Sequence, residues 1–130
     1  MTVEAVRAQV SADPYARSLG IELLELAPGY CRAALRLGAA TTNFQGSPHG
    51  GAIFSLADFA FSAACNSHGE PAVALSVTIH YLAAAAPDAR LTAEAREQRQ
   101  GKRAGFYGIV VRDDDGTLIA SAQAVAFRSG

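Results

Sequence analysis

The stretch His49–His68 constrains the fold more than any other part of the chain. It is long enough for about five helical turns, and its side chains are apolar nearly all round such a helix. A helix of this kind belongs inside a protein or in a membrane. Gly69 suits its end and Pro71 forbids its continuation. The sequence therefore predicts one long central helix around which the other elements pack.

A narrow polar stripe interrupts this apolar helix. Ser55, Asp58 and Ser62 fall at positions i, i+3 and i+7 and so share one face. Asp is a poor residue for a helix interior, and a buried carboxylate without a partner is costly. One interpretation is a carboxylate satisfied by an Arg or by backbone amides, or placed at an exposed helix edge. The other is a catalytic carboxylate aimed into a cleft.

The composition is that of one globular domain spanning residues 1–130. Half of the residues are apolar and the formal net charge is −1, so no bulk charge favours nucleic acid as a partner. No apolar run approaches the roughly 20 residues of a membrane span. The amino-terminal residues have neither the basic start nor the apolar core of a signal peptide. We therefore expect a cytoplasmic protein with no membrane or nucleic-acid partner.

The two cysteines, Cys31 and Cys65, lie far apart in the sequence and lack the spacing of metal ligands. Free thiols in a reducing compartment are the expected state. Cys65 is either a small buried residue of the apolar helix or a nucleophile. No cofactor or metal is expected, because four further candidate ligands also show no recognisable spacing. They are His49, Asp58, His68 and His80.

The remaining elements follow from apolar periodicity and turn residues. Residues 3–18 read as one helix or two short ones, with Asp13 and Pro14 starting the second and Gly20 following it. Residues 38–47 have the composition of a loop. The predicted strands are bounded by Gly, Pro and Asp turn signals. They are 21–26, 30–37, 73–82, 91–98, 106–112 and 117–127.

These elements predict a hairpin, the long helix, and then four strands in a meander. Sequential strands joined by tight turns form antiparallel pairs. One helix and about six strands share a core only if the sheet curls around the helix. The strand edges left over predict pairing with a second copy in a two-fold dimer.

This layout resembles the hotdog-fold thioesterases, and within them the PaaI-like family named for phenylacetic acid degradation. The similarity covers the chain from about residue 14. It implies an α+β hotdog fold, with an antiparallel sheet of about five to six strands wrapped around one long central helix. The residues that carry it are Asn43, the run His49–Asp58, Ala64–Ser67, the strand Ala72–Leu82, and Phe127–Arg128.

The resemblance also implies a role for each matching residue. Asp58 would attack the thioester carbonyl or activate water, and Ser62 would orient that water. Gly50 would donate its N–H to the thioester oxygen, and Asn43 would come from the other subunit to help hold that oxygen or the water. His49 would position the loop and the acyl end of the site. The implied substrate is an acyl-CoA, of aryl or phenylacetyl type, bound at the interface of a homodimer or a dimer of dimers.

Elementary chemistry supports these roles, although simpler interpretations stay open. A helix start offers unpaired N–H groups and about half a positive charge, and the glycines Gly50 and Gly51 let a substrate approach the backbone. Against this, His49 equally well braces the helix start, and Asn43 in a loop is typical of a turn residue. Ser62 can also bond back to the helix backbone.

A basic cluster near a predicted turn suits the phosphates of coenzyme A. It comprises Arg96, Arg99, Lys102 and Arg103. A solvated turn is the simpler interpretation of any one of them. Many members of the family carry Arg-Pro after the third strand, whereas this chain has Ala83–Ala84 there. Because that Arg is missing, one expected phosphate contact is absent. A Gly-Asp common before the next strand is also replaced, at 87–89.

Two other functions fit the same residues. A non-catalytic acyl-CoA-binding module would keep the fold and the basic cluster but would not need Asp58. An acyl-thioester hydratase or dehydratase needs an acid/base pair around the acyl chain, for which His49 is the candidate.

Overall fold

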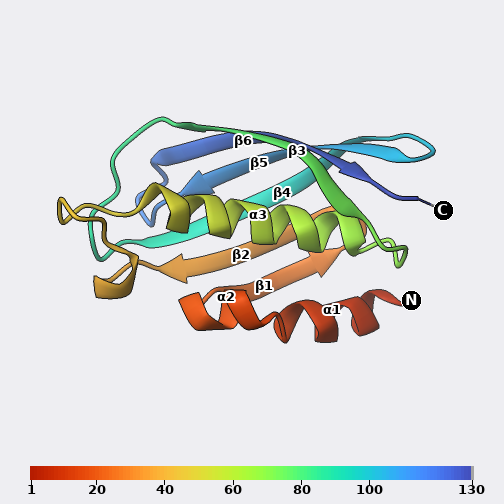
Figure 1. The fold of residues 1–130 in the computed structure, drawn as a ribbon, viewed down its shortest axis with the longest axis horizontal. Coiled ribbons are helices and arrows are strands. Elements are labelled where there is room, and N and C mark those ends of the chain that lie inside the picture. Colours follow the sequence, from red (N-terminus) through yellow and green to blue (C-terminus); the bar gives the residue numbers. More distant parts are fainter. Residues whose placement is uncertain (130) are drawn as a thin grey trace.

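The computed structural model describes residues 1–129 of the chain. Three α-helices, one short 3-10 helix and a single sheet make up this part (Figure 1). The helices are α1 (Val3–Ser11), α2 (Pro14–Leu19), η1 (Ala39–Thr41) and α3 (Gly50–Asn66). The strands are β1 (Glu22–Ala27), β2 (Tyr30–Arg36), β3 (Val73–Tyr81), β4 (Arg90–Gln100), β5 (Ala104–Arg112) and β6 (Leu118–Phe127).

The long apolar helix forms where the sequence predicts it. α3 begins at Gly50, directly after its N-cap His49, and lies across one face of the sheet (Figure 1). The prediction of one antiparallel sheet around one long helix is confirmed. The buried residues of α3 are Ala52, Ile53, Leu56, Ala57, Phe59, Ala60, Phe61, Ala63, Ala64 and Cys65.

The strand order is β1-β2-β4-β5-β6-β3, and every neighbouring pair is antiparallel. The predicted meander is therefore correct for β4, β5 and β6 but wrong for β3. This strand pairs with β6 and forms an edge of the sheet. The cause is the link at 82–89, which is longer than a tight turn and carries the chain across the end of the sheet (Figure 1).

Alanines on the sheet let α3 pack closely against it. Ala33, Ala93 and Ala95 are fully buried on β2 and β4, and Ala124 and Ala126 of β6 are only 2% exposed. Small side chains leave room for the larger ones of the helix, as close-packed interiors require.

Larger groups fill the space where the sheet offers it. The ring of Phe61 meets Tyr107 of β5 edge-to-face, with 5.5 Å between ring centroids, an arrangement that aromatic pairs favour. The position of α3 against the sheet is thus set by side chains from both layers.

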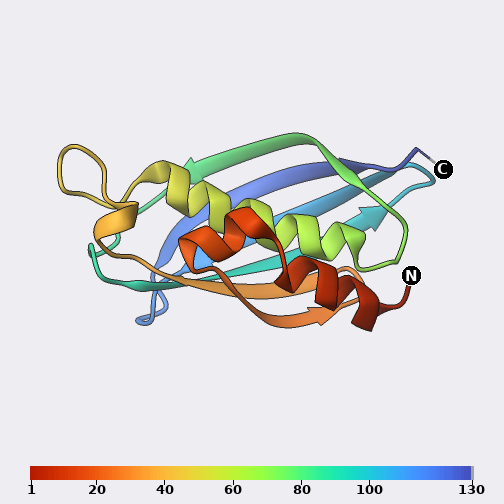
Figure 2. The same ribbon diagram turned by 60° about the horizontal axis from the view of Figure 1, so that its bottom comes forward.

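The amino-terminal segment forms two short helices beside α3 and β1 (Figure 2). Asp13 caps α2 by accepting the N–H of Ala16 at 3.0 Å, and Gly20 ends it with a φ of 84°. α1 is fastened to the sheet by Arg7, whose guanidinium donates to the Leu26 carbonyl at 3.1 Å. The Asp13–Pro14 helix start predicted from the sequence is confirmed.

The carboxyl-terminal end of α3 is held by a buried arginine. Arg128 is 8% exposed and donates to the Cys65 carbonyl at 3.4 Å and to Gln100 Oε1 at 3.3 Å. Glu70 lies 3.9 Å from the same guanidinium. A cation at a helix C-terminus interacts favourably with the negative end of the helix dipole. Arg128 therefore stabilises this end of α3 and joins it to the end of the sheet.

Replacing Arg128 with Ala is expected to lower the free energy of unfolding by about 1–3 kcal/mol, because the buried Cys65 carbonyl and the part-buried Gln100 amide oxygen lose their charged donor. Urea denaturation followed by circular dichroism measures the change. The exposed Arg103 gives the matched control, since Arg103→Ala removes the same charge at the neighbouring turn and should stay within about 0.5 kcal/mol of the wild type. Equal stability of the two variants would contradict a capping role.

Candidate active site

The start of α3 presents one backbone N–H group without an acceptor. His49 Nδ1 accepts the N–H of Gly51 at 2.8 Å, and the N–H groups of Ala52 and Ile53 reach the His49 carbonyl. Within the described part of the chain, the N–H of Gly50 has no acceptor. Because a helix start carries about half a positive charge, this free donor suits an oxygen that gains negative charge.

The same cap defines what His49 and Gly51 do. A ring nitrogen that accepts an N–H carries no proton, so Nδ1 of His49 is unprotonated in this cap. His49 therefore braces the helix start, which is one of the two roles left open by the sequence. The N–H of Gly51 is occupied by this contact, and a Cβ on Gly51 would lie 3.0 Å from His49 Nδ1.

Beside Gly50 lies a cavity of about 330 Å³, which Ile53 and Tyr81 also line. The Tyr81 hydroxyl donates to the Gly50 carbonyl at 3.0 Å. A Cβ on Gly50 would lie 3.5 Å from the Tyr81 ring, an ordinary contact, and the φ of Gly50 is not positive. The fold does not require glycine here, and without a side chain the backbone at this position is open to close approach by a ligand.

Asp58 lies in a different cavity, of about 300 Å³, whose apolar walls include Phe54 and Phe59. Its carboxylate is half-buried and has no hydrogen-bond or ion-pair partner among the residues that the structure describes. Burial raises the pKa of Asp58 above its ordinary value, and the nearby negative charge of Asp13 raises this pKa further. The interpretation of a carboxylate satisfied by an Arg or by backbone amides is therefore wrong.

The three residues of the polar stripe all line this second cavity. Ser55 is used by the fold, because its hydroxyl donates to the Gly51 carbonyl at 2.8 Å and bonds to the Tyr15 hydroxyl at 2.9 Å. Ser62 is exposed, and its hydroxyl has no partner within the described residues. One turn from Asp58, this hydroxyl is free to hold a water molecule.

The two candidate groups are far apart in one chain. Gly50 and Asp58 are eight residues apart on α3, which corresponds to about 12 Å along the axis. An N–H at one point and a carboxylate at the other cannot both touch one thioester carbonyl. We therefore distinguish two candidate half-sites on each chain, a donor half-site at Gly50 with Asn43 in the preceding loop, and a carboxylate half-site at Asp58 and Ser62.

Asn43 is a turn residue in the structure. Its Oδ1 accepts the N–H groups of Gln45 and Ser47 at 2.9 and 3.1 Å, a pattern typical of Asx turns. Its side-chain nitrogen has no acceptor among the described residues. The bridge between Thr42 and Pro48 closes this loop just before α3. The turn leaves the Asn43 amide nitrogen available as a second donor in the loop that precedes α3.

The structure does not bring the basic residues to the donor half-site. Lys102 and Arg103 are exposed in the β4–β5 turn, and Arg99 is exposed near the end of β4. This turn lies at the carboxyl-terminal end of α3. The Arg128 N–H donates to the Arg103 carbonyl in the turn, and the Arg128 guanidinium donates to the Cys65 carbonyl at the end of α3. Gly50 begins the opposite end of this 17-residue helix, about 24 Å away along the axis.

Two residues near the half-sites carry no sequence signal for that position. Asp13 is recognisable as a helix cap, but only the packing of α2 on α3 brings it to the cavity of Asp58. Tyr81 is recognisable as the end of a strand, but its hydrogen bond to Gly50 depends on β3 being the edge strand beside the helix start. Both contacts join residues more than thirty positions apart.

Neither cysteine is a nucleophile. Cys31 and Cys65 are free and buried, and burial raises the pKa of these thiols to about 12 and about 11. A thiol with such a pKa is almost wholly protonated at neutral pH, and only the thiolate attacks. Among residues 1–129, no three His, Cys, Asp or Glu side chains are grouped to hold a metal ion.

The geometry can be compared with known proteins. The sequence model of the thioesterase superfamily matches residues 45–120. The acyl-coenzyme A thioesterase PaaI of Escherichia coli is 36% identical over 118 residues, which are 91% of this chain and 84% of that protein. A putative esterase of Archaeoglobus fulgidus is 38% identical over 110 residues, which are 85% of this chain and 71% of that protein.

The chain belongs to the thioesterase superfamily. The solved structure of the E. coli PaaI protein from the phenylacetic acid degradation operon matches it with a TM-score of 0.93 at 35% identity, covering 98% of this chain and 92% of that one. The hotdog fold and the PaaI-like resemblance are thus confirmed, and the protein is a thioester hydrolase. None of the helices described is long and apolar enough to span a membrane.

Replacing Asp58 with Asn should make this thioesterase more stable near neutral pH, raising its melting temperature by about 2 °C. Because the folded-state pKa of Asp58 is raised, its carboxylate destabilises the native state above that pKa. Below the unfolded pKa both states are protonated, so the difference should disappear in acid. Thermal unfolding of both proteins at pH 7 and at pH 3.5 measures this, and a less stable variant at pH 7 would contradict it.

Proposed function

We propose that this thioesterase hydrolyses acyl-CoA thioesters, with aryl or phenylacetyl-type acyl groups preferred. The observation that carries the proposal is the half-buried carboxylate of Asp58, which has no partner in the described chain and faces a cavity. The name of the E. coli relative, acyl-coenzyme A thioesterase, supports the substrate class. Phe54, Phe59 and Tyr15 line the same cavity, and such walls suit an aromatic acyl group.

In the proposed reaction, the free N–H of Gly50 donates to the thioester oxygen and stabilises its negative charge as the carbonyl is attacked. Asp58 acts either as the nucleophile or as the general base that takes a proton from water. Ser62 and the Asn43 amide hold the water or the oxygen. The thiolate of coenzyme A is a good leaving group, so no strong acid is needed to expel it.

The edge of β3 favours self-association. β3 is an edge strand, and its residues Val73 and Leu75 are each 66% exposed. It contains no Asp, Glu, Lys or Arg, whereas the other edge strand, β1, carries Glu22 and Glu25. Charged edges resist pairing, and uncharged apolar edges favour it. We therefore propose a two-fold dimer in which the β3 strands of two copies pair antiparallel.

Such a dimer can unite the two half-sites. A two-fold axis perpendicular to the paired strands runs the two α3 helices in opposite directions. The donor half-site of one copy then faces the carboxylate half-site of the other. This arrangement resolves the separation of about 12 Å between Gly50 and Asp58 within one chain, and it gives two composite sites per dimer.

The same reversal offers a place for the coenzyme A phosphates. The β4–β5 turn lies at the carboxyl-terminal end of its own α3. In the antiparallel dimer this is the end at which the α3 of the other copy begins. We propose that Arg99, Lys102 and Arg103 of one copy bind the phosphates of a coenzyme A whose thioester lies at Gly50 of the other.

The first experiment measures thiol release from phenylacetyl-CoA, benzoyl-CoA and straight-chain acyl-CoAs. The wild-type protein is expected to hydrolyse these thioesters. Asp58→Asn should lose roughly 10²–10⁴-fold in kcat/KM, the usual range for a positioned acid or base. Asp88→Asn, which changes an exposed carboxylate on the link at 82–89, is the matched control and should keep full activity. No turnover, or an Asp58→Asn protein as active as the wild type, would overturn the mechanism.

A complementation experiment tests the composite site. Gly50 is the first residue of α3, and His49 before it is extended, so the proline backbone fits there and its ring replaces the N–H. Gly50→Pro is expected to lose roughly 10²–10³-fold in kcat. When Gly50→Pro and Asp58→Asn chains are unfolded together and refolded as a mixture, about one quarter of wild-type activity should return, because half of the dimers are mixed and one of their two sites is intact.

Two controls accompany the mixture. Gly50→Ala keeps the N–H and has room for its methyl group at 3.5 Å from Tyr81, so it should fold with the stability of Gly50→Pro but retain more activity. A mixture of Asp58→Asn with Asp58→Ala chains should recover nothing, because no site then holds a carboxylate. Recovery in neither mixture would show that both half-sites must act within one chain and would overturn the composite site.

A further inference from the structure

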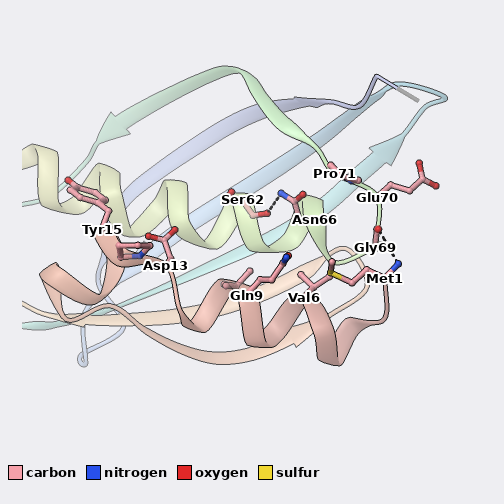
Figure 3. A pocket seen from close by; sticks show the side chains of 12 residues that line it. Met1, Val6, Gln9, Asp13, Tyr15, Ser62, Asn66, Gly69, Glu70 and Pro71 are labelled. Carbon is pink, nitrogen blue, oxygen red and sulfur yellow. Dashed lines mark hydrogen bonds between the residues drawn. The ribbon is translucent and has the colours of Figure 1, made fainter.

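A groove continues from the cavity of Asp58 along α3. A cavity of about 620 Å³ lies between α1 and the carboxyl-terminal half of α3 (Figure 3). It shares three lining residues, Asp13, Tyr15 and Ser62, with the cavity that holds Asp58. The two cavities therefore adjoin across these side chains. Val6 and Val10 give the larger one an apolar wall.

Asp13 stands at the junction of the two cavities with half of its carboxylate unused by the fold. Its Oδ1 caps α2 by accepting the N–H of Ala16 at 3.0 Å. Its other oxygen has no hydrogen-bond partner within the described residues. Figure 3 shows this carboxylate between the amino-terminal helices and α3. Capping of α2 accounts for Oδ1 of Asp13, and the other carboxylate oxygen faces the groove.

The charges at the end of this groove near Asp58 are all negative. Asp13 and Asp58 are its carboxylates near the reaction, and Glu70 lies at its far end. Of the residues described, no Lys or Arg side chain lines either cavity. The amino group of Met1, which donates to the Gly69 carbonyl at 3.3 Å, also lies at the far end. A short acyl group beside Asp13 meets only negative charge.

We propose that the two adjoining cavities form the acyl-binding groove and that Asp13 determines specificity by excluding acyl groups that carry a carboxylate. This inference rests on the proposed hydrolysis of acyl-CoA. A carboxylate on the acyl group would lie close to the charge of Asp13 where little water screens it, and like charges repel strongly there. A neutral acyl group meets no such repulsion and packs on Val6 and Val10.

The rise in the pKa of Asp58 supports the closeness of the two carboxylates, because the charge of Asp13 is one of its two causes. Asn at position 13 would cap α2 about as well as Asp does. The negative charge of Asp13 is therefore not needed for the fold, which leaves a role in the groove.

The test compares kcat/KM for two matched pairs of substrates, hexanoyl-CoA with glutaryl-CoA and phenylacetyl-CoA with 4-carboxyphenylacetyl-CoA. Wild-type protein is expected to prefer the neutral member of each pair by at least about 100-fold. Asp13→Asn is expected to reduce both preferences by about tenfold. Because the readout is a ratio within one protein, a small change in the amount of folded enzyme does not affect it.

Glu4→Gln is the matched control, since it removes one negative charge from an exposed position on α1 that lines neither cavity, and its ratios should equal those of the wild type. Asp13→Asn with wild-type ratios would overturn the role of Asp13 while leaving the thioesterase activity standing. Equal hydrolysis of both members by the wild type would also overturn it. No hydrolysis of any of the four substrates would overturn the proposed function itself.

Discussion

Burial of α3 against the alanine-lined sheet decides where every reactive group can lie. Ten of its side chains are buried, so the helix cannot rotate without exposing apolar surface. The remaining strip carries Asp58 and Ser62 and faces the amino-terminal helices. Because Gly50 and Asp58 belong to one continuous α-helix, helix geometry fixes the spacing between them. That fixed spacing is what makes a second copy necessary for the proposed chemistry.

The groups left without partners are the ones proposed for the reaction. The fold satisfies its polar atoms closely, and no buried side-chain nitrogen or oxygen of the described residues lacks a hydrogen bond. Against this background, the free Gly50 N–H, the unpaired Asp58 carboxylate and the free Ser62 hydroxyl stand out. Each is only half-buried or exposed, so the cost of leaving it unpaired is tolerable. These groups are ready to bind a ligand without first breaking an internal contact.

Features that depend on local sequence could be predicted, and those that depend on distant packing could not. The apolar periodicity of α3, its polar stripe and the Asp13 cap of α2 are local, and the structure confirms them. The place of β3 at the sheet edge was predicted wrongly, because strand order depends on which edges remain free after folding. The proximity of Asp13 to Asp58 was missed for the same reason, since it arises only when α2 packs on α3.

A hydrogen bond joins the edge strand β3 to the start of α3. Tyr81 is the last residue of β3, and its hydroxyl holds the Gly50 carbonyl at 3.0 Å. In the proposed dimer, β3 is also the strand that pairs with the other copy. In that dimer, the pairing of the β3 strands would therefore act on the Gly50 N–H through one side chain, that of Tyr81. In the proposed dimer, this uncharged edge strand would set the geometry of the donor half-site against the carboxylate of the other copy, and dimer formation would align the site.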